Sequence, residues 1–67
     1  MIQLSINGEP RTFAPGSSIA QMLVELELTG KRIAVERNGE IVPRSQFADT
    51  MLSDGDQLEI VVAVGGG

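Results

Sequence analysis

Residues 17–26 read SSIAQMLVEL, and this stretch predicts the single helix against which the rest of the chain folds. Its apolar residues recur at the i, i+3, i+4 and i+7 spacing of one helix face: Ile19, Met22, Leu23 and Leu26. Ser18 is followed three residues later by Gln21, which is the pattern of a capping box at a helix N-terminus. We expect the helix to end at Thr29-Gly30, with Gly30 as a left-handed C-cap.

Two β-hairpins are predicted, one on each side of this helix. Before it, apolar and polar residues alternate over residues 2–6, and an Asn-Gly dipeptide at 7–8 leads into a short return strand. After it, a strand pattern at residues 33–36 is followed by a second Asn-Gly dipeptide at 38–39 and another short return strand. Asn-Gly favours the positive φ angles of a type I′ turn, so both dipeptides are strong hairpin signals.

The longest strand pattern covers residues 57–64 and follows a tight turn at residues 54–56. Its alternate apolar residues are expected to share one face of the sheet: Leu58, Ile60, Val62 and Val64. Between the second hairpin and this strand, residues 45–53 predict a loop with one short helical turn. The expected apolar anchors of this loop are Phe47, Met51 and Leu52.

The element order is therefore β-β-α-β-β-turn-β in a chain of 67 residues, which is long enough for one domain. One helix can cover one face of one mixed sheet, so the expected class is α+β. Parallel pairing through a right-handed crossover would place the first or the last strand centrally. This is the arrangement of a β-grasp, ubiquitin-like domain with about five strands. We expect that domain at residues 1–64 and a flexible glycine tail at residues 65–67.

The composition excludes several classes of function. Five basic and nine acidic residues give a net charge of −4, which disfavours binding to nucleic acid and to anionic membranes. The sequence has no Cys and no His, so it lacks a thiolate nucleophile and the commonest general base and metal ligand. With no leader pattern and no apolar stretch near the roughly 20 residues that span a bilayer, we expect a cytoplasmic protein.

The glycine tail is the first candidate for chemistry. A tail without side chains can enter a narrow channel and deliver the α-carboxylate of Gly67, with Gly65 and Gly66 leading it, to the active site of another protein. A carboxylate reacts only after activation, usually by ATP, and Gly30-Lys31 lacks the other residues of a phosphate-binding loop. The activating enzyme must then be a partner, and the chain itself is not expected to be an enzyme. The alternative is a disordered end.

Three further features of the sequence are candidates for a site. Val61 and Ala63 alternate with the inward residues of the last strand, so they would form a small apolar patch beside the tail that, together with Val64, could dock a partner. Simple β-propensity explains Val61 and Ala63 equally well. Arg44 could pair with an acidic loop of a partner if it lies near the tail. Asp54 and Asp56 flank a turn glycine and lack further oxygen ligands, so no metal site is expected.

In its order of elements, its length and its motifs, the sequence resembles the ThiS family of sulfur carrier proteins in thiamin (thiazole) biosynthesis. Residues 33–46, IAVERNGEIVPRSQ, are similar to the family pattern AVxxNxxIVPR, and Asp54-Gly55-Asp56 matches its usual DGD. The terminal Gly66-Gly67 also fits, although all ubiquitin-like carriers share a diglycine. Gly65 adds a third glycine that departs slightly from the pattern. The resemblance covers the whole chain.

The resemblance implies a mechanism in which the protein is a co-substrate. A ThiF-type adenylyltransferase would use Mg-ATP to adenylate the Gly67 carboxylate, and a cysteine desulfurase or another sulfur donor would convert it into a thiocarboxylate. The thiocarboxylate would give its sulfur to the thiazole synthase ThiG. The chain would bind no cofactor itself.

Three alternatives remain open on the sequence. One is a sister sulfur carrier of the molybdopterin-synthase small-subunit type, which is usually longer and lacks the IVPR stretch. Another is a ubiquitin-like modifier that is joined to protein lysines. The third is a non-covalent β-grasp interaction module, for which the tail would be dispensable.

Overall fold

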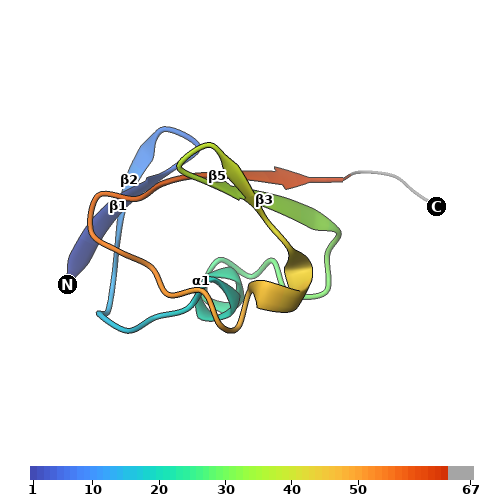
Figure 1. The fold of residues 1–67 in the computed structure, drawn as a ribbon, viewed down its shortest axis with the longest axis horizontal. Helices are drawn as coiled ribbons and strands as arrows, with labels where there is room; N and C mark the ends of the chain where they lie inside the picture. The colour runs from blue at the N-terminus through green and yellow to red at the C-terminus, as the bar shows by residue number, and fades with distance from the viewer. Residues whose placement is uncertain (64–67) are drawn as a thin grey trace.

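The computed structural model describes residues 1–63, in which a five-stranded sheet is covered on one face by a single α-helix (Figure 1). The elements in chain order are β1 (Ile2–Ile6), β2 (Glu9–Phe13), α1 (Ile19–Glu25), β3 (Ile33–Arg37), β4 (Glu40–Val42), the 3-10 helix η1 (Arg44–Gln46) and β5 (Gln57–Val62). This arrangement confirms the predicted β-grasp fold of class α+β, including the short helical turn before the last strand.

The last strand, β5, lies in the centre of the sheet, whose order is β2-β1-β5-β3-β4. It runs parallel to β1, where Ile6 pairs with Leu58, and antiparallel to β3, where Val35 pairs with Ile60. Both hairpins form as predicted, and their turns have the positive φ angles of type I′: 52° and 83° at Asn7-Gly8, 51° and 86° at Asn38-Gly39. The strand that leads to the glycines is therefore held on both sides.

Helix α1 begins where the sequence predicts but ends earlier. The capping box is present, because the Gln21 N–H donates to Ser18 Oγ and the Ser18 N–H donates to Gln21 Oε1. The helix stops at Glu25, however, and not at Thr29-Gly30, so the prediction of Gly30 as its C-cap is wrong. Gly30 has a φ of 86° but belongs to the following turn.

The early end of α1 is a Schellman motif with Glu27 in the left-handed position. Glu27 has a φ of 59°, its N–H donates to the Val24 carbonyl, and the Leu28 N–H donates to the Leu23 carbonyl at 2.9 Å. Leu26 and Leu28 both pack against the core, and this packing favours the turn of the chain at Glu27. Apolar packing thus outweighs the cost of a non-glycine residue in this conformation.

The core fills the space between α1 and the inner face of the sheet, and its largest fully buried side chains are Ile19, Met22, Val35 and Leu58. Phe47 and Leu52 are buried as predicted anchors, but Met51 is 50% exposed, so its prediction as an anchor is wrong. Met51 bridges Ser18 through its backbone, and the next residue, Leu52, takes the inward position. No helix among residues 1–63 is long and apolar enough to span a membrane.

Candidate functional site

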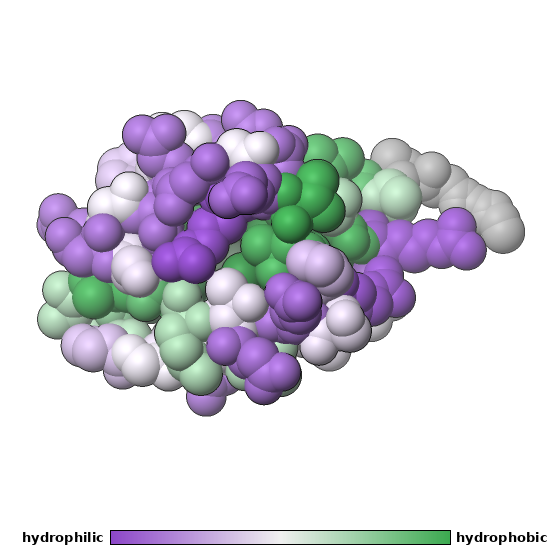
Figure 2. Space-filling model, viewed as in Figure 1, coloured by the Kyte–Doolittle hydropathy of each residue, from purple (hydrophilic) through white to green (hydrophobic). Residues whose placement is uncertain are grey.

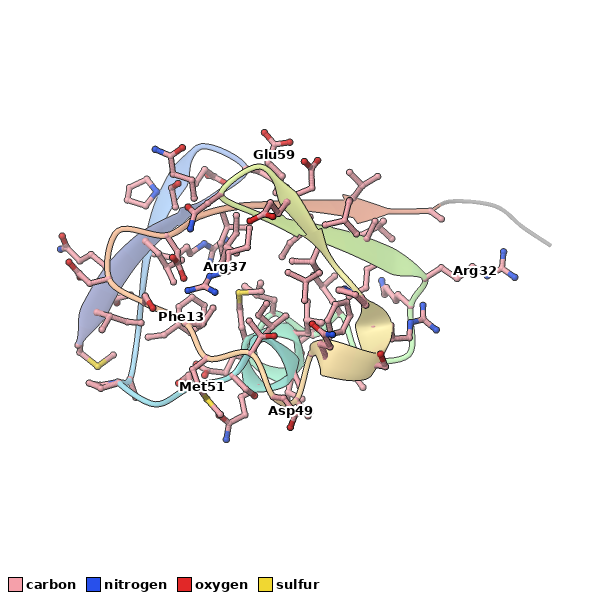
Figure 3. All side chains as sticks on the ribbon, viewed as in Figure 1. Phe13, Arg32, Arg37, Asp49, Met51 and Glu59 are labelled. Atoms are coloured by element: carbon pink, nitrogen blue, oxygen red, sulfur yellow. The ribbon has the colours of Figure 1, made fainter. Side chains whose placement is uncertain are left out.

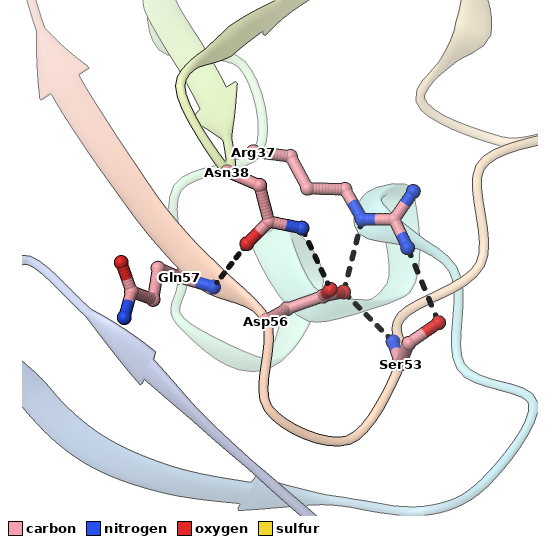
Figure 4. Close-up of polar contacts among 5 residues, drawn as sticks. All are labelled: Arg37, Asn38, Ser53, Asp56 and Gln57. Atoms are coloured by element: carbon pink, nitrogen blue, oxygen red, sulfur yellow. Dashed lines mark hydrogen bonds and ion pairs between the residues drawn. The ribbon is translucent and has the colours of Figure 1, made fainter.

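A polar cluster under the start of β5 fixes the strand that leads to the glycine tail (Figure 4). Asp56 accepts hydrogen bonds from Arg37 Nε at 3.0 Å, from the Ser53 N–H at 2.8 Å and from Asn38 Nδ2 at 3.1 Å. Asn38 Oδ1 in turn accepts from the Gln57 N–H at 2.9 Å. The Asp56 carboxylate thus accepts from two segments, residues 37–38 and Ser53, and its contacts are those of a structural group.

The same contacts set the ionisation of Asp56. Burial is the largest influence and would by itself raise its pKa, but the hydrogen bonds from Ser53, Arg37 and Asn38 and the charge of Arg37 together hold the pKa below its ordinary value of 3.8. A buried carboxylate with a lowered pKa and three hydrogen-bond donors around it is a poor general base. Among residues 1–63, no three acidic side chains gather where they could hold a metal ion.

A second asparagine clamps β5 from the other side. Asn7 Oδ1 accepts from the Ile60 N–H at 2.8 Å, and Asn7 Nδ2 donates to the Ile60 carbonyl at 3.1 Å. Asn7 and Asn38 therefore each form a type I′ turn and bond to the central strand. Only the first of these roles is predictable from the sequence, because the second depends on which strands are neighbours.

The C-terminal end of β5 is exposed on the outer face of the sheet. Val61 is 61% exposed and Ala63 is exposed as well, as expected from their alternation with Leu58 and Ile60, while Val62 is 37% exposed. Val62 pairs with Ile33, and the Ala63 N–H donates to the Arg32 carbonyl at 2.8 Å. The sheet thus holds the chain as far as Ala63.

The structure places Arg44 on a different face from Val61 and Ala63. Arg44 begins η1 and lines a groove of about 350 Å³ between α1, η1 and the start of β3. This groove lies on the helix side of the sheet, whereas Val61 and Ala63 face away from the helix. The groove is not predicted from the sequence, whose one local signal for it is the basic pair Lys31-Arg32, which also lines it.

Four predicted site residues lie outside the described part of the chain: Val64, Gly65, Gly66 and Gly67. Their predicted roles, and the docking roles of Val61, Ala63 and Arg44, therefore stay predictions.

Comparison with known proteins gives a consistent set of similarities. The model of the ThiS family matches residues 4–67. A thiazole synthase from Paramagnetospirillum magneticum is 47% identical over 66 residues, which are 98% of this chain and 20% of that protein. The chain therefore spans about a fifth of this relative's length. The sulfur carrier protein ThiS of Escherichia coli is 30% identical over 66 residues, covering 98% of this chain and all of that protein.

A solved structure supports the same relationship at the level of the fold. The crystal structure of the thiamine biosynthesis protein ThiS from Geobacter metallireducens is 33% identical, with a TM-score of 0.83 over 98% of this chain and 100% of that one. The body described here is thus similar to it over its full length.

Proposed function

The chain belongs to the ThiS family of sulfur carriers, and we propose that residues 1–63 form a body that presents the carboxylate of Gly67 to partner enzymes. In this role the chain acts in thiamin biosynthesis as a carrier and not as an enzyme. The observation that carries the proposal is that the family match runs from residue 4 to residue 67, so it includes the glycines as well as the folded body.

The proposed cycle has three steps, all catalysed elsewhere. A ThiF-type adenylyltransferase that holds Mg²⁺ and ATP converts the Gly67 carboxylate into an acyl adenylate and releases pyrophosphate. The persulfide of a cysteine desulfurase, or of another sulfur donor, then displaces AMP to form an acyl disulfide, and a thiol reductant cleaves its S–S bond to leave the thiocarboxylate. The thiocarboxylate passes its sulfur to a thiazole synthase, and the relatives of that name support this last partner.

The structure supports this proposal through the position of β5. A central strand, paired on both sides and clamped by Asn7 and Asn38, gives a rigid base for a tail that must reach a defined point in another active site. Among residues 1–63, every core residue precedes residue 61, so the glycines can be altered without removing any of these core side chains. We propose that Val61, Ala63 and Val64 contact the partner beside the tail.

The test is the intact mass of the chain after incubation with a ThiF-type enzyme, Mg-ATP and a sulfur donor. We expect a gain equal to the replacement of one oxygen by one sulfur. A variant lacking Gly66 and Gly67, and a variant extended beyond Gly67 by an uncleaved peptide, should show no gain while their thermal unfolding stays unchanged. An unchanged mass of the wild-type chain with an enzyme that modifies another ThiS protein would refute the proposal. It would favour a non-covalent interaction module.

A further inference from the structure

The groove on the helix side combines an apolar floor with a cationic rim. The floor includes the apolar residues Leu23, Ile33 and Phe47. The rim includes the basic residues Lys31, Arg32 and Arg44. Its volume of about 350 Å³ lies at the lower end of the range for binding clefts, so it can hold one or two large side chains of a partner. Figure 2 shows hydrophobic residues gathered toward the end of the molecule at which β5 ends, bordered by hydrophilic ones.

The charge of the rim is opposite to that of the whole chain. Three of the five basic residues line this groove, although the net charge is −4, and no acidic residue lines it. Within residues 1–63 the ion pair is Arg37–Asp56, so Lys31, Arg32 and Arg44 have no carboxylate partner there. A local positive potential on an acidic protein selects a negatively charged partner and orients its approach.

The groove also lies beside the exit of the chain from the sheet. Arg32 and Ile33 contact the end of β5 and the residue after it, because Ile33 pairs with Val62 and the Arg32 carbonyl accepts from the Ala63 N–H. Figure 3 shows the Arg32 side chain extending away from the body at this end. Gly67 is the fourth residue after Ala63, so an enzyme that holds the Gly67 carboxylate lies within about 14 Å of Ala63.

We propose that this groove docks an acidic segment of the adenylating enzyme. One apolar side chain of that segment fills the floor, and carboxylates on either side of it pair with the rim. This inference rests on the proposed function, because it takes the enzyme that activates Gly67 as the partner. The groove is a second contact surface, on the opposite side of the sheet from Val61 and Ala63. The enzyme would then contact both sides of the strand that carries the tail.

The test compares two charge reversals in binding to the ThiF-type adenylyltransferase, measured by surface plasmon resonance at low and at high salt. Arg44→Glu alters the rim, and Arg11→Glu makes the same change in net charge at an exposed position on β2. We expect Arg44→Glu to slow association about tenfold at low salt and by less at high salt, because salt screens exposed charges. Arg11→Glu should change association by less than about twofold.

A second pair of variants tests the floor. Val24 lines the groove and is 61% exposed, so Val24→Asp should speed dissociation without unfolding the chain. Met51→Asp, at an exposed position outside the groove, is its control. If the wild-type chain gains sulfur but Arg44→Glu and Val24→Asp bind like their controls, the docking inference is wrong and the carrier function stands. If Arg44→Glu instead abolishes self-association in sedimentation, the occupant is a second copy, which also overturns it. If the wild-type chain gains no mass, both the docking inference and the proposed carrier function are wrong.

Discussion

At the scale of single residues, the two turn asparagines carry more of the structure than their positions suggest. Asn38 supplies the positive φ of the turn and also bonds to both Asp56 and the backbone of Gln57. Asn38→Gly keeps the turn conformation but removes both side-chain hydrogen bonds, so we expect a loss of about 1–3 kcal/mol in the free energy of unfolding. Urea denaturation measures it. A loss below a few tenths of a kcal/mol would show that water replaces the amide.

Asp56 predicts an acid-dependent part of the stability. Because its pKa is lowered in the folded chain, the stabilisation is complete above the ordinary value of 3.8 and is lost as the pH falls through that value toward the lower folded pKa. Free energies of unfolding measured between about pH 2 and pH 6 should therefore decline less steeply for Asp56→Asn than for the wild-type chain. Asp49→Asn removes the same charge from an exposed side chain and serves as the control. Equal slopes in both variants would contradict this role.

At the scale of elements, the end of α1 carries a local cost that a single substitution can remove. Glu27 adopts a φ of 59°, which costs an L-residue roughly 1–2 kcal/mol and a glycine almost nothing. We expect Glu27→Gly to stabilise the chain by about 0.5–1 kcal/mol in thermal or urea unfolding.

The matched control lies two residues earlier. Glu25 is the last residue of α1, so Glu25→Gly removes the same charge but should destabilise the chain, by up to about 1 kcal/mol. If the two substitutions change the free energy of unfolding in opposite directions, the backbone conformation at residue 27 is the cause. A destabilising Glu27→Gly would instead show that its side chain matters more than its φ angle.

These elements show which features the sequence can predict. The Asn-Gly turns and the Ser18–Gln21 capping box each involve residues within four positions of one another, so a short stretch of sequence is enough to predict them. The C-terminus of α1 was predicted wrongly because glycine usually takes the left-handed position, whereas here the packing of Leu26 and Leu28 puts Glu27 there. The groove depends on three separate segments meeting in space, and no local pattern records that.

At the scale of the whole molecule, two unlike surfaces lie at the end where the chain leaves the sheet. The outer face there is apolar and lacks charge at Val61 and Ala63, and the helix side has the cationic groove. A partner that binds the tail between them would contact both. A substitution at Val61 can therefore change partner binding with little change in the free energy of unfolding, because Val61 is 61% exposed and contributes little to the core.

Val61→Asp tests this expectation. We expect it to reduce the kcat/KM of the partner adenylyltransferase about tenfold, mainly by raising KM, since a charge placed in an apolar contact weakens binding. Because aspartate has a low strand propensity, Val61→Thr provides a second variant that keeps a β-branched side chain and should give a smaller effect of the same sign. Met51→Asp, at an exposed apolar position outside this surface, should leave kcat/KM within about twofold. If Val61→Asp lowers stability and leaves kcat/KM unchanged, Val61 serves the strand rather than the partner, and the enzyme grips the helix side alone.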